Sequence, residues 1–227
     1  MNKQKIIFAV IFTVIGFIAL EVKLTNLAGS KATFTLFDAF APIAGSFLGG
    51  AFGIVSVVVM KALNGFVHRA DMVDIGFAIR LLPTLFAVWY FSSKRKSLLI
   101  VPLLAIIAFN LNPVGRQVWF FSLFWTIPII CHFLRERFLL ARALGATFNA
   151  HAVGGAIWVW MVPLPASVWV GLIPVVIIER SLFALGIVGS FVCVKSLIHL
   201  LLTKYGMDLN PHTAHAPPQR LSVESPR

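Results

Sequence analysis

Charged side chains are scarce in this 227-residue sequence: they make up 12% of the chain, and Asp and Glu together number only 8. An ordinary soluble domain is about 25% charged and roughly 45–50% apolar. Here hydrophobic residues reach 59%, and the mean hydropathy is +0.92. The composition therefore predicts an all-α integral membrane protein, a multi-pass protein of the cell membrane whose first partner is the lipid bilayer.

Signature motifs of common catalytic sites are also lacking. The sequence has no His-Glu-x-x-His, no Gly-x-Ser-x-Gly and no close pair of carboxylates on one helix face. Gly-Lys never occurs as a dipeptide, which excludes a phosphate-binding loop of the ATPase kind. We therefore expect no enzyme activity and no cofactor, and a step driven by ATP hydrolysis would need another chain.

Cysteine is rare as well, and the net charge of +11 needs an explanation. Cys131 and Cys193 both lie in apolar segments, so we expect two small buried residues rather than a disulfide or a metal site. Most Lys and Arg residues punctuate apolar segments, where they orient a protein in the membrane. A nucleic-acid partner is therefore not expected.

Apolar runs alternate with short polar connections along residues 1–204, which we expect to form one membrane domain. The runs cover residues 6–20, 38–60, 75–91, 98–109, 118–130, 143–161 and 168–202. Residues 21–37 are mixed in character and predict a loop or a cap. The tail at 205–227 is polar and proline-rich, so it is predicted to be disordered.

Basic clusters suggest how these runs cross the membrane. The clusters at 94–96 and 135–142, and Lys204, look cytoplasmic, because Lys and Arg concentrate on that side. The run at 98–109 is short for a span of ~20 residues and can also be re-entrant or interfacial. A compact bundle of six transmembrane helices with both ends cytoplasmic is favoured, and seven with the N-terminus outside is the alternative.

Small residues recur at every fourth position in the run that follows Phe34. They are Ala41, Gly45, Gly49 and Gly53. Such a ladder lets another helix approach closely, because no side chain holds the two backbones apart. From Asp38 to Met60 the run carries no further charge, so it predicts one membrane helix with a packing spine and a carboxylate at its start.

Charges inside apolar runs are the first candidates for a site, because such residues face the bundle interior and have partners there. Asp38, Arg80, Glu179 and Arg180 are placed in this way. Glu179 and Arg180 are adjacent and point ~100° apart on a helix. They are therefore better placed to pair with other helices than with each other, and Asp38–Arg80 and Glu179–Arg80 are the expected pairs. Structural ion pairing and recognition of a ligand carboxylate or amine both remain open.

A polar turn between two apolar runs is the second candidate. It contains Asn110, Asn112, Arg116 and Gln117, followed by Trp119. The planar fork of Arg suits a carboxylate or phosphate, and a neighbouring indole can stack on a ring. An ordinary interfacial turn with a tryptophan at the membrane surface is the alternative.

Asn149 and His151 are polar groups in a segment without any Lys, Arg, Asp or Glu. Either residue could line a pocket, and a satisfied hydrogen bond between helices is the other interpretation. Trp158, Trp160 and Trp169 bracket a Pro-Leu-Pro turn and are expected at the membrane interface.

The sequence resembles the substrate-binding S component of energy-coupling factor (ECF) vitamin transporters. The resemblance is carried by Asp-Ala-Phe-Ala-Pro-Ile-Ala-Gly-Ser-Phe-Leu-Gly-Gly at 38–50 and Ile-Arg-Leu-Leu-Pro-Thr at 79–84. It implies a six-helix bundle with a substrate pocket near the outer surface, capped by loops. It also implies a transmembrane scaffold subunit and two cytoplasmic ATPases as partners. The first apolar run departs from the family, having Ala9 and Thr13 where an alanine-x-x-x-alanine docking motif is expected.

We expect a membrane subunit that binds a vitamin or another small polar metabolite, with its pocket among the candidates named above. Two other functions stay open. One is a membrane-embedded enzyme acting on lipid or isoprenoid, with His151 and Glu179 as acid and base. The other is a stand-alone secondary transporter that uses Asp38 or Glu179 as its proton site.

Overall fold

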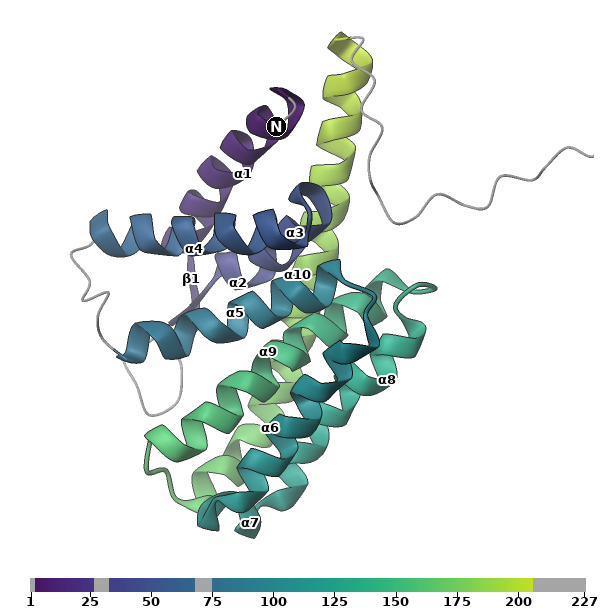
Figure 1. Ribbon diagram of the computed structural model, residues 1–227. Coiled ribbons are helices and arrows are strands. Elements are labelled where there is room, and N and C mark those ends of the chain that lie inside the picture. Colours follow the sequence, from purple (N-terminus) through teal and green to yellow (C-terminus); the bar gives the residue numbers. More distant parts are fainter. Residues whose placement is uncertain (1–2, 27–32, 68–74, 206–227) are drawn as a thin grey trace, which may run out of the picture.

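The computed structural model describes residues 3–26, 33–67 and 75–205, and helices dominate these residues, which confirms the predicted all-α class (Figure 1). The α-helices and the short 3-10 segments (η) are α1 (Lys3–Glu21), α2 (Leu36–Phe40), η1 (Ala41–Ile43), α3 (Ala44–Leu48), α4 (Gly50–Val67), α5 (Ile75–Ser92), η2 (Lys96–Leu99), α6 (Ile100–Leu111), α7 (Pro113–Gln117), η3 (Trp119–Thr126), α8 (Ile127–Leu134), α9 (Leu139–Met161) and α10 (Ala166–Tyr205). The predicted tail lies outside the described residues except for Tyr205, where α10 ends.

A small β-hairpin follows α1, in the segment predicted to be a loop or a cap. Strand β1 (Lys23–Asn26) pairs antiparallel with β2 (Thr33–Thr35). The pairing continues into α2, because the backbone N–H of Leu36 donates to the carbonyl of Val22 at 2.8 Å. Threonine and phenylalanine in β2 favour an extended backbone, but two strands this short give only a weak signal in the sequence.

The glycine-rich run is not the single helix that the sequence predicts. It begins as α2, tightens into η1 with Pro42 in its first turn, and continues as α3. Gly49 then adopts φ = 93° and ψ = 148°, a conformation open to glycine and strained for other residues. The chain turns there and starts again as α4. A single straight span over 38–60 is therefore wrong.

The small residues of this run nevertheless form the packing spine that their spacing predicts. A Cβ atom on Gly53 would lie 2.5 Å from the Cα atom of Gly45, so the backbones of α3 and α4 are in direct contact. A Cβ atom on Gly45 would lie 2.6 Å from the Cβ atom of Ser92, on α5. The ladder therefore brings three helices together, two of them from the same apolar run.

Buried apolar side chains form two cores, and α9 and α10 pass through both. The first core lies among α1 to α5 and includes Phe12, Phe40, Ile43, Met60, Val88 and Phe91. The second lies among α6, η3 and the first half of α10 and includes Phe109, Phe121, Trp125, Phe148, Trp169 and Val176. Along α9, Ala143 and Ala146 belong to the first core and Ala152 and Ala156 to the second.

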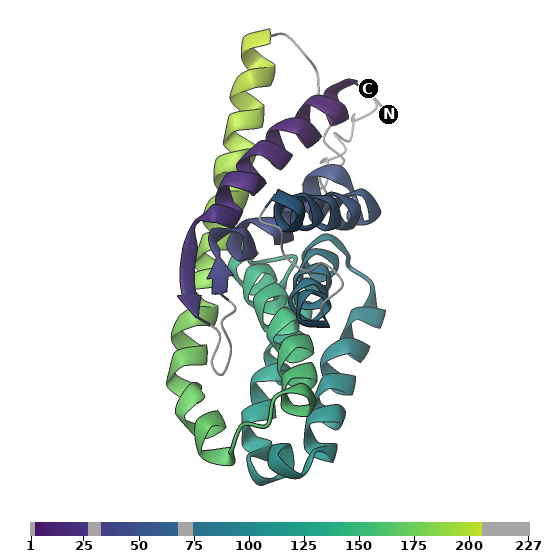
Figure 2. The same cartoon turned by 90° about the vertical axis from the view of Figure 1, so that its left-hand side faces the viewer.

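The two views show how these elements are arranged. The start of α1 and the end of α10 lie at the same end of the molecule (Figures 1 and 2). Helices α4 and α5 run across the middle, while α6, α8 and α9 lie beside the first half of α10 at the other end (Figure 1). The two chain ends of the described part therefore agree with an arrangement in which both face the same side.

Two helices among the described residues are long and apolar enough to cross a membrane, by length and composition alone. They are α4, over Gly50–Val67, and α10, over Ala166–Leu200. Shorter apolar segments include Lys96–Leu111 and Trp119–Leu134, and the second begins as a 3-10 helix before α8. The predicted bundle of six or seven crossings therefore stays a prediction.

The two cysteines are free and differ in burial. Cys131 on α8 is buried, as expected, whereas Cys193 on α10 is exposed, so the expectation of burial is wrong for the second residue. Cys193 lies on a face of α10 that also leaves Val192 and Leu197 exposed, whereas the neighbouring Phe191 packs against Phe47 and Phe91.

Candidate functional site

Interior charged and polar side chains gather where α2, α9 and α10 approach one another. We call Asp38, Lys61, Thr84, His151, Glu179 and Arg180 the interior polar group. Asp38 accepts the backbone N–H of Thr35, and the ring of the preceding residue, Phe34, contacts Arg180 on α10. His151 lies on α9, which packs against α10. Four of these residues were candidates from the sequence, and Lys61 and Thr84 were not.

Asp38 links the start of α2 to two other helices. One carboxylate oxygen accepts the backbone N–H of Thr35 at 2.9 Å, as an acidic residue in the first turn of a helix commonly does. The other oxygen lies 3.9 Å from Lys61 Nζ on α4 and 3.5 Å from Thr84 Oγ1 on α5. Lys61 also donates to Thr84 at 3.0 Å. Asp38 thus fixes how α2, α4 and α5 meet.

Arg80 lies on α5 one turn before Thr84, but its side chain is outside the described residues. The expected pairs Asp38–Arg80 and Glu179–Arg80 therefore stay predictions. Among the described residues the partner of Asp38 is Lys61, which stands at the end of an apolar run in the sequence.

Arg180 is buried in α10 and lies against two aromatic rings, Phe34 and Phe183, whose centres are 5.6 Å apart. Its guanidinium carbon lies 4.8 Å from the ring centre of Phe34, on β2, and 4.7 Å from that of Phe183. Its Nη2 pairs with the neighbouring Glu179 at 3.2 Å, so the expectation that these two residues avoid each other is wrong. The arginine side chain is long enough to turn back along the helix, and the two rings hold its plane in that position.

His151 on α9 stands in a cage of aromatic residues. Its ring centre lies 5.6 Å from that of Phe121, 6.1 Å from those of Trp125 and Phe148, and 6.4 Å from that of Phe124. The indole Nε1 of Trp125 donates to His151 Nδ1 at 3.1 Å. An indole can only donate, so Nδ1 is the acceptor and the proton of the neutral ring is on Nε2.

Each of these two groups offers contacts that suit a planar polar solute. The Nε2–H group of His151 is a donor, and its aromatic walls suit a ring. Arg180 adds a planar cation, and its Nε has no hydrogen-bond partner among the described residues although it is buried. A buried N–H without an acceptor is unfavourable, so a carboxylate or carbonyl oxygen from a solute would stabilise it.

Asn149 forms a hydrogen bond between helices, which was one of the two roles considered for it from the sequence. It is fully buried on α9, and its Nδ2 donates to the backbone carbonyl of Phe86 on α5 at 3.2 Å. Its Oδ1 has no hydrogen-bond partner among the described residues. The side chain therefore joins two helices and does not contact the caged histidine.

The polar turn lies apart from the interior polar group. Asn112 caps the start of α7, its Oδ1 accepting from the backbone N–H of Val114 at 2.9 Å, and its Nδ2 donates to the carbonyl of Val159 at 3.1 Å. Arg116, Gln117 and Trp119 are exposed. The structure therefore shows a capped turn with exposed polar side chains, and its place at a membrane interface stays a prediction.

Sequence reasoning missed Trp125 and Phe34 as neighbours of the candidate residues. Trp125 sits in a 3-10 segment read as an ordinary apolar span, and Phe34 precedes the glycine-rich run. Tryptophan with a buried indole N–H needs an acceptor, and His151 is the polar residue in the apolar interval 143–178 that can supply a ring nitrogen. The need of a buried tryptophan for a hydrogen-bond acceptor was therefore the signal in the sequence for the Trp125–His151 contact.

No protein-family model matches the chain, and no significant match is found among curated proteins or solved structures. The likeness to ECF S components rests on residues 38–50 and 79–84.

Proposed function

We propose that this chain is a multi-pass membrane subunit that binds a vitamin or another small polar metabolite for an ECF-type uptake system. Its solute would lie between the aromatic cage of His151 and the guanidinium of Arg180. Transport would depend on a transmembrane scaffold and two ATPases, because the sequence lacks a phosphate-binding loop.

Exposed apolar side chains support insertion in a bilayer. Helix α6 leaves Leu103, Leu104 and Ile107 exposed, and α10 leaves Ile178, Leu182 and Leu185 exposed, each at 48% or more. A soluble protein rarely exposes contiguous apolar faces of this kind. Lipid would cover them, and the shorter helices would then cross or enter the membrane within a bundle.

The observation that carries the binding proposal is the unpartnered, buried Nε atom of Arg180. A structural arginine of this kind would normally have its N–H groups satisfied by the protein. Here the stacking rings and Glu179 fix the guanidinium while one donor is left for another molecule.

Native mass spectrometry of the purified chain would test the site through a retained small molecule. Arg180→Lys keeps the charge and removes the planar fork, and His151→Phe keeps an aromatic wall and removes the donor. Arg116→Lys and His199→Phe are matched controls, since both residues are exposed. We expect the molecule to be lost from the two interior variants and kept by the two controls. Loss from Arg116→Lys alone would place the pocket at the polar turn instead.

Three further observations separate the candidate functions. Co-purification of the chain with an ATPase pair supports the ECF-type subunit. Turnover of a lipid or isoprenoid by the isolated chain in detergent would support the enzyme. Uptake into liposomes by the chain alone under a proton gradient would support the secondary transporter.

A further inference from the structure

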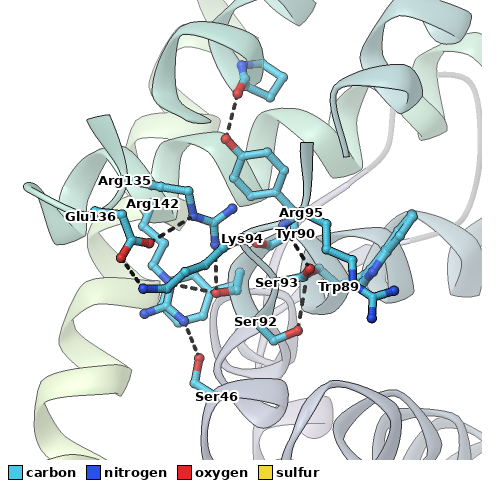
Figure 3. Close-up of polar contacts among 12 residues, drawn as sticks. Ser46, Trp89, Tyr90, Ser92, Ser93, Lys94, Arg95, Arg135, Glu136 and Arg142 are labelled. Atoms are coloured by element: carbon cyan, nitrogen blue, oxygen red, sulfur yellow. Dashed lines mark hydrogen bonds and ion pairs between the residues drawn. The ribbon is translucent and has the colours of Figure 1, made fainter. Parts of the chain in front are cut away.

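Two arginines bind the end of α5 in a region separate from the interior polar group (Figure 3). Arg135 Nη2 donates to the carbonyls of Tyr90 and Phe91, at 2.7 and 3.2 Å. Arg142 donates from Nε to the carbonyl of Phe91 at 2.5 Å and from Nη2 to Ser46 Oγ at 2.6 Å. The final carbonyls of a helix lack intrahelical partners and carry partial negative charge, so cations stabilise them.

Both guanidinium groups are buried, at 3% exposure for Arg135 and 6% for Arg142. Arg142 is held by these two hydrogen bonds and by the ring of Phe91, whose centre lies 4.1 Å from its guanidinium carbon. Arg135 is different, because its Nε and Nη1 have no hydrogen-bond partner among the described residues. Burial lowers the pKa of Arg135 from its ordinary value, as it also does for Arg142.

Glu136 is an exposed carboxylate next to the incompletely hydrogen-bonded guanidinium of Arg135. One carboxylate oxygen lies 3.9 Å from Arg135 Nε, and the other forms an ion pair with Lys94 (Figure 3). Its side chain is 47% exposed, so it can move away without leaving a cavity in a core. An incoming anion could therefore take the place of this carboxylate beside Arg135.

Positive charge exceeds negative charge strongly in these two turns. Segments 94–96 and 135–142 hold six basic side chains and the single carboxylate of Glu136. Lys94 is paired with Glu136, whereas Arg95, Lys96 and Arg137 are exposed. An anion with several oxygens is the chemistry that such a cluster recognises.

Exposed apolar side chains surround the cluster and indicate where that anion comes from. Phe133 and Leu134 at the end of α8, Phe138 before α9, and Ile100 at the start of α6 are all exposed, Phe133 at 70%. A soluble phosphate would gain nothing from these groups, whereas a phospholipid places its acyl chains beside its phosphate. Basic pockets between membrane helices bind lipid head groups in this way.

We propose that the turns at 92–96 and 134–138 bind the phosphate head group of an anionic phospholipid, with Arg95, Lys96 and Arg137 around it and Arg135 beneath it. The proposal rests on insertion in a bilayer but does not depend on which solute the protein binds. Glu136 then acts as an internal competitor for the lipid phosphate.

Lipid retention by the full chain in neutral detergent tests this site. The probes are phosphatidylglycerol and phosphatidylcholine with identical acyl chains, counted on the protein by native mass spectrometry. We expect preferential retention of phosphatidylglycerol. The triple variant Arg95→Gln, Lys96→Gln, Arg137→Gln should lower that preference by roughly fivefold per cation, about a hundredfold in all. All three side chains are exposed, so the variant is expected to fold.

Glu136→Gln gives the opposite expectation, since removing the competing carboxylate should raise phosphatidylglycerol retention severalfold. Arg116→Gln removes an exposed arginine on α7, away from the two turns, and is the control for loss of a single surface charge, which should change nothing. Equal retention of both lipids, or no difference between the triple variant and the control, would overturn the proposal. Displacement of phosphatidylglycerol by millimolar inorganic phosphate would also overturn it and indicate a soluble phosphate ligand. Solute retention, measured in the same spectra, reports separately on the pocket around Arg180.

Discussion

Trp125 Nε1 lies 3.1 Å from His151 Nδ1, and this hydrogen bond joins η3 to α9. It fixes both the tautomer and the orientation of the imidazole, because the indole has no acceptor to offer. The other ring nitrogen, Nε2, is therefore the one that a bound solute would meet.

Replacing Trp125 by Phe should destabilise the protein and weaken solute retention together. The substitution leaves the buried His151 Nδ1 without a donor, which costs about 1–3 kcal/mol, and removes part of a fully buried ring. Thermal unfolding in detergent measures the first effect and native mass spectrometry the second. Trp119→Phe is the matched control, because Trp119 is 57% exposed. Equal melting temperatures for the two variants would show that the hydrogen bond does not stabilise the fold.

Three glycine-to-alanine variants should separate backbone strain from close packing. Gly49→Ala meets no atom within 4 Å, so its cost is the strained backbone at φ = 93°, of order 1–3 kcal/mol. Gly53→Ala should cost at least as much, because its Cβ would contact the backbone of α3. Gly171→Ala lies in open space on α10 and should stabilise by up to about 1 kcal/mol. Thermal unfolding in detergent gives the ranking, and a neutral Gly49→Ala would argue against the break between α3 and α4.

Arg142→Lys should destabilise the junction of α3, α5 and α9. A lysine cannot reach the carbonyl of Phe91 and the hydroxyl of Ser46 with the same geometry, and each lost charged hydrogen bond costs about 1.5–3 kcal/mol. Arg137→Lys provides the comparison, since this exposed residue should change stability by no more than about 0.5 kcal/mol. Chemical unfolding monitored by tryptophan fluorescence would check both values, and similar midpoints would contradict the proposed role of Arg142.

The apolar runs in the sequence predicted the helix positions correctly where one run forms one helix. The runs at 6–20, 75–91, 143–161 and 168–202 all lie within single helices. The run at 38–60 does not, because its break depends on Gly49, and a regular small-residue repeat looks the same on a straight helix as on a folded one. The spacing of the small residues shows that they share one face of a helix. It does not show whether the backbone continues as a single straight helix.

Partners of the buried charges were harder to predict than their burial. Arg180 and Asp38 were recognised as interior residues because apolar neighbours flank them, but their contacts depend on side-chain length and on residues far away in the sequence. Arg135 and Arg142 were grouped with a surface cluster, since these two buried arginines and the exposed Arg137 look alike in a charge run. Only the tertiary structure shows that both side chains donate to the last carbonyls of α5.

The length of α10 sets how the protein can sit in a bilayer. Its 40 residues rise about 1.5 Å each and so extend about 60 Å, twice the ~30 Å depth of the hydrocarbon layer. Even at a tilt of about 40°, the steepest usually seen, about 14 residues must project beyond the lipid tails. The final stretch of that size carries Lys195 and Lys204. If α10 spans a bilayer with Arg180 at lipid depth, its last turns would therefore form a rigid stalk at the membrane surface.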